Sequence, residues 1–589
     1  MLCENCKKQV NNVTFKNLML EKIFNCEHCR YVKDTIENSC NSANIIYKNV
    51  IFRHLNLIMP IKLNDAVFCL ESVTDENKII SNTIKQLGHN NCYFRTKEEK
   101  FNIINSVLGL LYDEFHNKIR YNPTKYLIEF LNCLEYNRYV ASKMVLWLKG
   151  KINHSISIED DLLNIIIESL DSIKVSENKK NYFDIKSVYF SIENLMAKDK
   201  ASLEHGIELT YRLICTNKSI FEKKEFDLSF IEVLSYIRAI DVIRYIKVET
   251  TEGVGSSLPL YIDENSNIVL TERFSNFHSH YISDMVNDRE IYDANKYIDN
   301  INNIIKEELG FSLDTVNKIV HDLSVNCKAG DEFLVGHKGY WCEVIQDICK
   351  CEKDEANSII EYFTYNTEGI DLFSESSRKD KRILRKCLIS IEDYYLCSVN
   401  TLTLSLIGFQ IDILDGEISN KKLVNSLNKI YKQIDDEFED KVYKEIKLNF
   451  KNLLIKKNVE QKDIKSKNYE EFQLPGEIDI LLLYNNKIFV IECKNYNLRI
   501  DYKSIANEFG RLTKINNKSV QGKLARKVNC IKENYKAVIE FMGGDCSLNY
   551  DSTPIGVITT STFSIVSNEE NTQFPIVTWT NLCDWIRNN

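Results

Sequence analysis

Proline and glycine are scarce in this chain, with 6 prolines and 19 glycines among 589 residues. Proline interrupts helices, and tracts rich in proline or glycine form flexible linkers. Their scarcity therefore favours long helices and argues against extended disordered linkers. The hydrophobic share of 44% and the charged share of 27% are typical of a globular protein that is long enough for two or more cores.

Long apolar runs are also missing, because no stretch reaches the roughly 20 residues that a membrane-spanning helix needs. The first residues include Cys3, Glu4 and Lys7, which do not form the basic and apolar regions of a secretory signal peptide. We therefore expect a cytoplasmic protein with no membrane partner. In a reducing compartment, most of the 19 cysteines would be free thiols.

An excess of positive charge is the third absence, since the formal net charge is -9. This value excludes a wholly basic nucleic-acid coat but allows a local basic groove. The segment 503–536 holds nine basic and two acidic residues, which favours contacts to a nucleic-acid backbone over a merely solvated helix face. The residues that we expect to make these contacts are Lys514, Lys518, Lys523, Arg526 and Lys527.

The pattern along the chain divides it into three regions. Residues 1–45 form a small cysteine-bearing module, and residues 46–420 form a mainly α-helical region with a small β insertion near 243–271. We expect this middle region, whose fold the sequence leaves unassigned, to recognise a substrate, partner or trigger. Residues 421–589 have an α/β pattern: one or two helices over 424–457, strands at 477–484 and 488–496, helices near 503–516 and 519–542, two further strands, and a closing helix.

Two Cys-x-x-Cys pairs lie in the first region. Cys3 and Cys6 form one pair, and Cys26 and Cys29 form the other. Each pair can present two thiolates to one ion, so the spacing predicts a structural Zn²⁺ site in a module similar to a zinc ribbon. Such a module would be folded by its metal and would bind nucleic acid or protein.

The segment GEIDILLLYNNKIFVIECKNY, residues 476–496, predicts a buried hairpin interrupted by charges. Side chains alternate across a strand, so Asp479 on one strand can meet Glu492 and Lys494 on the next. Carboxylates are costly to bury alone, and a divalent cation with oxygen ligands removes that cost. The alternative is a solvated hairpin with a Glu492–Lys494 salt bridge, which the strongly apolar flanks disfavour.

The pattern Asp479…Glu492-Cys493-Lys494 resembles the core of the PD-(D/E)XK nuclease superfamily, whose members have a restriction-endonuclease-like fold. The resemblance covers residues 421–589, and Ile478 stands where the proline of the family name would be. It implies that Asp479, Glu492 and the backbone carbonyl of Cys493 bind Mg²⁺ or Mn²⁺, and that Lys494 is catalytic. The family's further helical glutamate matches Glu439 better than Glu445, and its helical glutamine matches Gln521.

These observations predict a metal-dependent nuclease that hydrolyses phosphodiester bonds, with DNA as the favoured substrate and defence against foreign DNA as one role. A repair or recombination nuclease is an alternative. A second alternative is a non-catalytic adaptor that uses a nuclease-like scaffold to bind nucleic acid or protein. The sequence shows no ATPase or helicase motif, so movement along DNA that consumes energy would need a protein partner. A second copy of the chain is also a possible partner.

Overall fold

The computed structural model of the chain describes the following residues: 47, 75–148, 185–216, 229–247, 250, 259–269, 297–327, 333–367, 381–391, 394–414, 416, 418–451, 453–465, 473–495, 511–513, 516, 518–545, 547–548, 550–562 and 572–589. These residues fall into two compact units, one up to Ser426 and one from Leu427 onwards. The four cysteines of the expected zinc module lie outside the described residues, as do Lys514 and most of the expected helix near 503–516.

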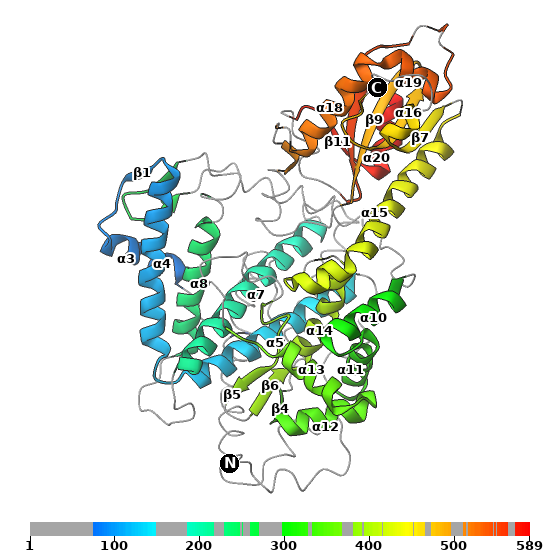
Figure 1. Cartoon of the computed structure of the whole chain (residues 1–589). Helices are drawn as coiled ribbons and strands as arrows, with labels where there is room; N and C mark the ends of the chain where they lie inside the picture. Colours follow the sequence, from blue (N-terminus) through cyan, green and yellow to red (C-terminus); the bar gives the residue numbers. More distant parts are fainter. Residues whose placement is uncertain are drawn as a thin grey trace, which may run out of the picture. The chain divides into compact units, whose positions relative to one another are not determined.

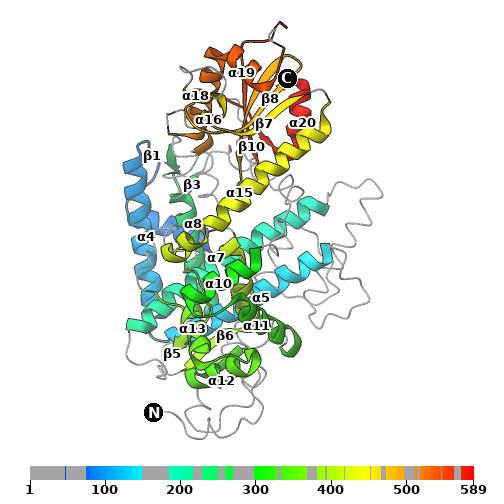
Figure 2. The same cartoon turned by 45° about the vertical axis from the view of Figure 1, so that its right-hand side comes forward.

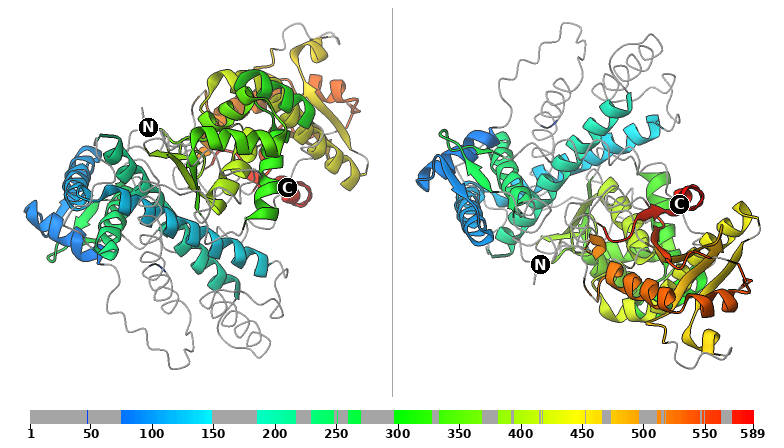
Figure 3. Two further views of the ribbon diagram at one scale, coloured as in Figure 1. Left: turned by 90° about the horizontal axis from the view of Figure 1, so that it is seen from below. Right: turned by 90° about the horizontal axis from the view of Figure 1, so that it is seen from above.

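The first unit is mainly helical (Figure 1). Figure 3 shows α5 and α7, in cyan and teal, running side by side. Thr96 and Glu99 form a reciprocal capping box at the start of α4, which satisfies backbone N–H groups that have no partner inside the helix. Its helices are α3 (Glu76–Gln86), α4 (Lys97–Ile119), α5 (Pro123–Leu148), α7 (Ile185–Thr216), α8 (Phe230–Lys247), α10 (Ile298–Leu309), α11 (Leu313–Asn326), α12 (Lys338–Cys349), α13 (Lys353–Phe363) and α14 (Val399–Leu414).

The described residues of this unit also include two small antiparallel sheets. The first contains β1 (Cys92–Phe94), β2 (Leu260–Ile262) and β3 (Ile268–Val269), in that order. The second contains β4 (Phe333–His337), β5 (Ile389–Ile391) and β6 (Tyr394–Ser398), in the order β4-β6-β5.

The expected β insertion near 243–271 is thus only partly right. Strands β2 and β3 lie in it, but residues 243–247 form the last turns of α8. Ile243, Arg244, Ile246 and Lys247 are all buried, so this end of the helix lacks the exposed face that produces a clear helical periodicity. The second sheet was not predicted from the sequence.

The second unit is built on a five-stranded mixed sheet with the order β11-β10-β9-β8-β7. Strands β7, β8 and β9 are antiparallel neighbours, whereas β9, β10 and β11 run parallel. The strands are β7 (Leu454–Val459), β8 (Ile478–Tyr484), β9 (Lys487–Lys494), β10 (Ile555–Thr560) and β11 (Ile576–Thr578).

Helices cover both faces of this sheet (Figures 1 and 2). On one face lie α18 (Val520–Glu533), α19 (Tyr535–Met542) and the short α16 (Gln461–Lys465); on the other lie α15 (Lys421–Asn449) and α20 (Trp579–Asn588). Leu524 and Val538 pack on the first face, and Phe438 and Val442 on the second. Strands β8 and β9 are therefore buried on both sides, which explains why their sequences are almost continuously apolar.

The hairpin turn follows directly from its residues. Asn485 and Asn486 have φ values of 47° and 62°, in the left-handed region that asparagine tolerates better than other side chains.

Two other expectations differ from the structure. The sequence predicts one or two helices over 424–457, but the helical part ends at Asn449 and Leu454–Val459 form β7. The helix expected over 519–542 is divided at Asn534. Short apolar runs such as LLI fit a helix or a strand until the sheet beside them is known.

Among the helices in the described part of the chain, none combines the length and the apolar character needed to cross a membrane.

Candidate active site

The hairpin β8–β9 brings three of the expected site residues to one end of the sheet. Asp479 is the second residue of β8, while Glu492 and Lys494 are among the last three residues of β9. The backbone N–H of Cys493 donates to Asp479 Oδ2 at 2.7 Å, which fixes the aspartate against the neighbouring strand. Asp479 is only 9% exposed and Glu492 only 5%, so two carboxylates lie together in a largely buried position.

Two lysines meet these carboxylates. Lys494 Nζ lies 2.8 Å from Glu492 Oε1 and 3.9 Å from Asp479 Oδ2. Lys527, which comes from α18, forms an ion pair with Glu492 Oε2, and its Nζ lies 4.0 Å from Asp479 Oδ1. The Lys527 side chain is 8% exposed, so it is part of the buried cluster.

The electrostatics of the cluster separate its two carboxylates. Burial, followed by repulsion from Glu492, raises the pKa of Asp479 to about 6. Burial would also raise the pKa of Glu492, but Lys494 and Lys527 together outweigh it and hold that pKa below its usual range. Glu492 is therefore the firmly ionised member of the pair, and Asp479 is the one that a further positive charge would help to ionise.

Glu439 approaches the same region from α15. Burial, together with the charges of Asp479, Asp436 and Glu477, raises the pKa of Glu439 to about 7. Asp435, one turn earlier on α15, accepts a hydrogen bond from Asn495 Nδ2 at 3.0 Å, just beyond the end of β9. The side of α15 near β9 thus adds acidic groups next to the Asp479–Glu492 pair.

Gln521 is placed differently from these residues. Its side chain is fully buried near the start of α18, where its amide accepts from Phe574 N at 2.9 Å and donates to Phe574 O at 3.1 Å. This pairing joins α18 to the chain that leads into β11. In this conformation both ends of the amide are occupied by backbone, so Gln521 acts as a connector between the two elements.

The basic residues of the segment also separate into two groups. Lys518, Lys523 and Arg526 are exposed, as expected for contacts with a nucleic-acid backbone. Lys527 differs from that expectation, because it is buried against Glu492 and Asp479. Its separation of 35 residues from Glu492 left no local pattern by which the sequence could reveal this contact.

A second feature that the sequence did not reveal lies on β10. Thr559 and Thr560 pair in register with Cys493 and Lys494, and both threonines are fully buried. Within the described residues, neither hydroxyl oxygen has a hydrogen-bond partner. Residues paired across parallel strands share a face, so Thr560 lines the side of the sheet that carries Lys494 and Glu492.

The donor atoms of this site suit a hard divalent cation. Asp479 and Glu492 supply carboxylate oxygens, and Cys493 supplies a carbonyl oxygen that accepts a hydrogen bond from Lys494 Nζ at 3.0 Å. In the part of the chain that the structure describes, no three His, Cys, Asp or Glu side chains are grouped as a complete metal site. The fit therefore rests on two carboxylates and one backbone carbonyl.

The fold and the site together define an α/β domain with a charged pair of carboxylates at the end of a buried hairpin. A family model described as the nuclease-related domain matches residues 434–555, which include Asp479, Glu492, Lys494 and Lys527. The prediction of a nuclease-like C-terminal domain is thus confirmed. Comparison with curated proteins gave no match, and comparison with solved structures gave none either.

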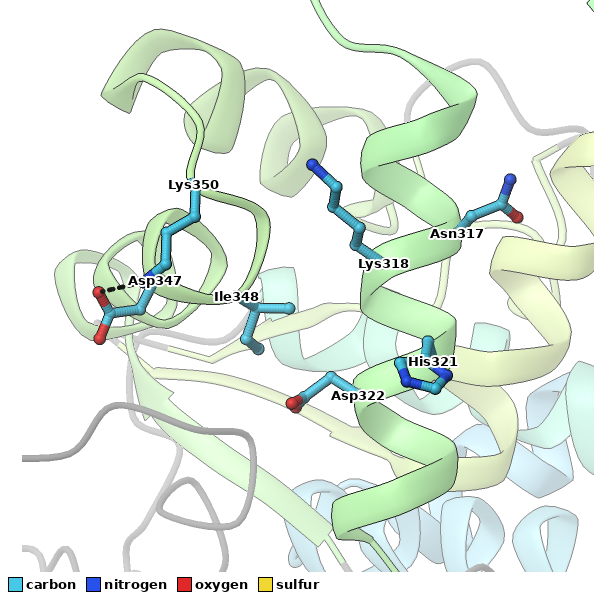
Figure 4. A pocket seen from close by; sticks show the side chains of 7 residues that line it. All are labelled: Asn317, Lys318, His321, Asp322, Asp347, Ile348 and Lys350. Atoms are coloured by element: carbon cyan, nitrogen blue, oxygen red, sulfur yellow. Dashed lines mark ion pairs between the residues drawn. The ribbon is translucent and has the colours of Figure 1, made fainter.

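The helical unit has a separate open pocket, shown in Figure 4. Its charged groups already serve the helices around it. Lys318 on α11 donates to the carbonyl of Cys349, at the end of α12, at 3.2 Å, and Lys350 pairs with Asp347 at 3.6 Å. We assign no ligand to this pocket. The residues that line it are Asn317, Lys318, His321, Asp322, Asp347, Ile348 and Lys350.

Proposed function

We propose that the C-terminal domain is a metal-dependent nuclease of the PD-(D/E)XK type that hydrolyses phosphodiester bonds, with DNA as its substrate. The observation that carries this proposal is the convergence of Asp479, Glu492 and Lys494 in a buried cluster of a nuclease-related domain. Buried carboxylates that face each other are costly for a fold, so their presence is best explained by chemistry.

In this proposal Asp479, Glu492 and the Cys493 carbonyl would hold Mg²⁺ or Mn²⁺, with Glu439 completing the ligand set from α15. The bound cation supplies Lewis acidity and makes a water molecule more acidic. Lys494, whose ammonium lies beside both carboxylates, would stabilise the charge that develops on the phosphoryl oxygens. The exposed Lys518, Lys523 and Arg526 would hold the DNA backbone without reading its sequence.

The test is cleavage of circular and linear DNA by the full chain with Mg²⁺ or Mn²⁺. We expect Asp479→Asn and Lys494→Ala each to lower the rate by about 10²- to 10³-fold, the size of effect seen when one charge-stabilising group is removed. Lys532→Ala, an exposed position on α18, is the matched control and should cut like the wild type. Cleavage that survives Asp479→Asn unchanged would refute the proposed site.

The non-catalytic adaptor and the repair nuclease remain the alternatives to this proposal. An adaptor predicts that DNA binding persists in Lys494→Ala while no variant, including the wild type, cuts. A repair or recombination enzyme predicts a strong preference for branched or damaged duplexes over intact ones. A role in defence against foreign DNA would require cleavage of incoming DNA in cells that carry the gene and none of the host's own.

We also propose that the two Cys-x-x-Cys pairs hold one structural Zn²⁺ ion. The support is their spacing alone. Metal analysis of the purified full chain should then give one zinc per molecule, and Cys3→Ser together with Cys6→Ser should remove it. Zinc retained by the double variant would contradict this assignment.

A further inference from the structure

Lys527 occupies a position that the nuclease motif on the hairpin does not account for. It comes from α18, is 8% exposed, and is the second ammonium beside Asp479 and Glu492. Lys494 already pairs with Glu492 from the neighbouring position on β9. The two carboxylates proposed to hold a metal ion therefore meet a lysine from each of two separate elements.

The formal charges of these four groups cancel. Two carboxylates and two ammonium groups make a neutral cluster in a largely buried place, and such balance is what a low-dielectric interior requires. A divalent cation added to this cluster would bring two positive charges, of which Glu439 from α15, once ionised, offsets only one. Metal binding is therefore unfavourable unless one ammonium leaves or further negative charge arrives.

Lys494 belongs to β9 and also donates to the carbonyl of Cys493, whereas Lys527 reaches the carboxylates from a separate helix, so release of Lys527 leaves the contacts within the hairpin in place. Once it has left the carboxylates it needs another anion. The exposed Lys523 and Arg526 on α18 offer a surface to which a phosphodiester can bind close by.

We propose that Lys527 is a resident counter-cation that competes with the divalent metal for Asp479 and Glu492, and that a phosphodiester receives it when the metal enters. The proposal rests on the proposed function and adds an order to it: metal and nucleic acid bind together, each favouring the other. Lys527 is thus a positioning residue that keeps the site closed to metal until substrate arrives.

The first experiment measures Mn²⁺ binding to the full chain by electron paramagnetic resonance, without nucleic acid. Lys527→Met keeps the length of the side chain and removes its charge, so it should bind Mn²⁺ about tenfold more tightly than the wild type. Lys527→Arg retains the charge and should remain weak, as should the matched control Lys532→Met on the exposed side of α18. Equal affinity of Lys527→Met and wild type would overturn the inference.

The second experiment uses calorimetry to measure Ca²⁺ binding with and without a short DNA duplex. The duplex should tighten Ca²⁺ binding to the wild type and should have a much smaller effect on Lys527→Met, because the competing ammonium is already gone. An equal effect of the duplex on both proteins would contradict the proposed coupling.

A third measurement needs no variant and so does not depend on Lys527→Met folding. Amine-reactive labelling of the wild type, read by mass spectrometry, should modify Lys527 faster when Mn²⁺ is saturating, while Lys532 is unchanged. Unchanged labelling of Lys527 at saturating Mn²⁺ would overturn the inference. The proposed function can fail separately from this inference. If neither the wild type nor Lys527→Met binds Mn²⁺, the proposed metal site does not exist. If Asp479→Asn loses Mn²⁺ binding, the metal site is located at Asp479.

Discussion

The two units of the molecule bury charge in different ways. In the helical unit, Arg238 forms an ion pair with Asp199, with side chains 7% and 5% exposed, and Glu135 accepts from the backbone N–H groups of Asn400 and Thr401 at 2.9 and 3.1 Å. Each of these acids faces a donor that the fold itself requires. In the C-terminal unit, Asp479 and Glu492 face two lysines but also lie beside each other, and repulsion from Glu492 is one of the causes of the raised pKa of Asp479.

This difference distinguishes buried charges that stabilise the fold from buried charges that belong to a candidate functional site. Glu135 closes the N-terminus of α14 from the neighbouring helix α5, so it satisfies N–H groups that would otherwise be buried without partners. Asp479 and Glu492 also have donors, the Cys493 N–H and the ammonium groups of Lys494 and Lys527, but unlike Glu135 they lie beside each other and cap no helix. Like charges gathered in one buried place are therefore the better guide to a functional site.

The largest effect is expected from breaking the structural ion pair. Asp199→Ala leaves the buried guanidinium of Arg238 without this partner, which should lower the free energy of unfolding of the helical unit by about 3 kcal/mol. Urea denaturation with hydrogen exchange in peptides from α7 and α8 would measure it. Glu361→Ala is the control: its ion pair with Lys338 is exposed, so the loss should stay below about 0.5 kcal/mol.

Removing the helix cap should have a smaller effect. Glu135→Ala leaves the N–H groups of Asn400 and Thr401 without their acceptor and should cost about 1 to 2 kcal/mol, seen as faster hydrogen exchange at the start of α14. Glu135→Gln retains one acceptor oxygen and should lose less. Equal losses in the two variants would mean that the negative charge of Glu135, and not its packing or one neutral acceptor oxygen, provides the stability.

The smallest expected effect is the change of stability with pH that the carboxyl groups of the candidate active site produce. In the folded chain the pKa is about 6 for Asp479 and about 7 for Glu439, above the usual 3.8 and 4.5. A carboxyl with a raised folded-state pKa favours folding fully below its unfolded value and loses that contribution as pH rises through its folded value. The lowered pKa of Glu492 acts in the opposite sense, but its contribution is complete above its unfolded value of about 4.5. The metal-free C-terminal unit should therefore lose stability, on the order of 1 kcal/mol, between about pH 5 and pH 7.

Thermal denaturation without metal across this pH range would measure the loss. Asp479→Asn removes one of the two titrating groups and should flatten the profile, with no matching change in hydrogen exchange from α7 and α8. Metal affinity should follow the opposite course and rise with pH, because the ligands must lose their protons to bind. Stability that increases from pH 5 to pH 7 in the metal-free chain would contradict the assignment.

The C-terminal unit could be predicted well where local pattern and long-range structure agree. The apolar runs of β8 and β9 and the Asn485–Asn486 turn define the hairpin, and the hairpin brings Asp479, Glu492 and Lys494 together. Prediction failed where a segment's neighbour decided its state. Residues 454–459 are a strand because β8 pairs with them, and β4–β6 join segments about 60 residues apart.

By itself, therefore, the sequence determined the hairpin, its charged end and the α/β character of the last region, because alternation and turn chemistry act between near neighbours. Only the tertiary structure decided the surroundings of that site: Lys527 between the carboxylates, Thr560 beside Lys494, and Gln521 paired with Phe574. The physical reason is that helix packing brings together groups that are dozens of residues apart. The spacing of Leu524, Val528 and Ile531 indicates which face of α18 is buried, but it does not encode which strand residues that face meets.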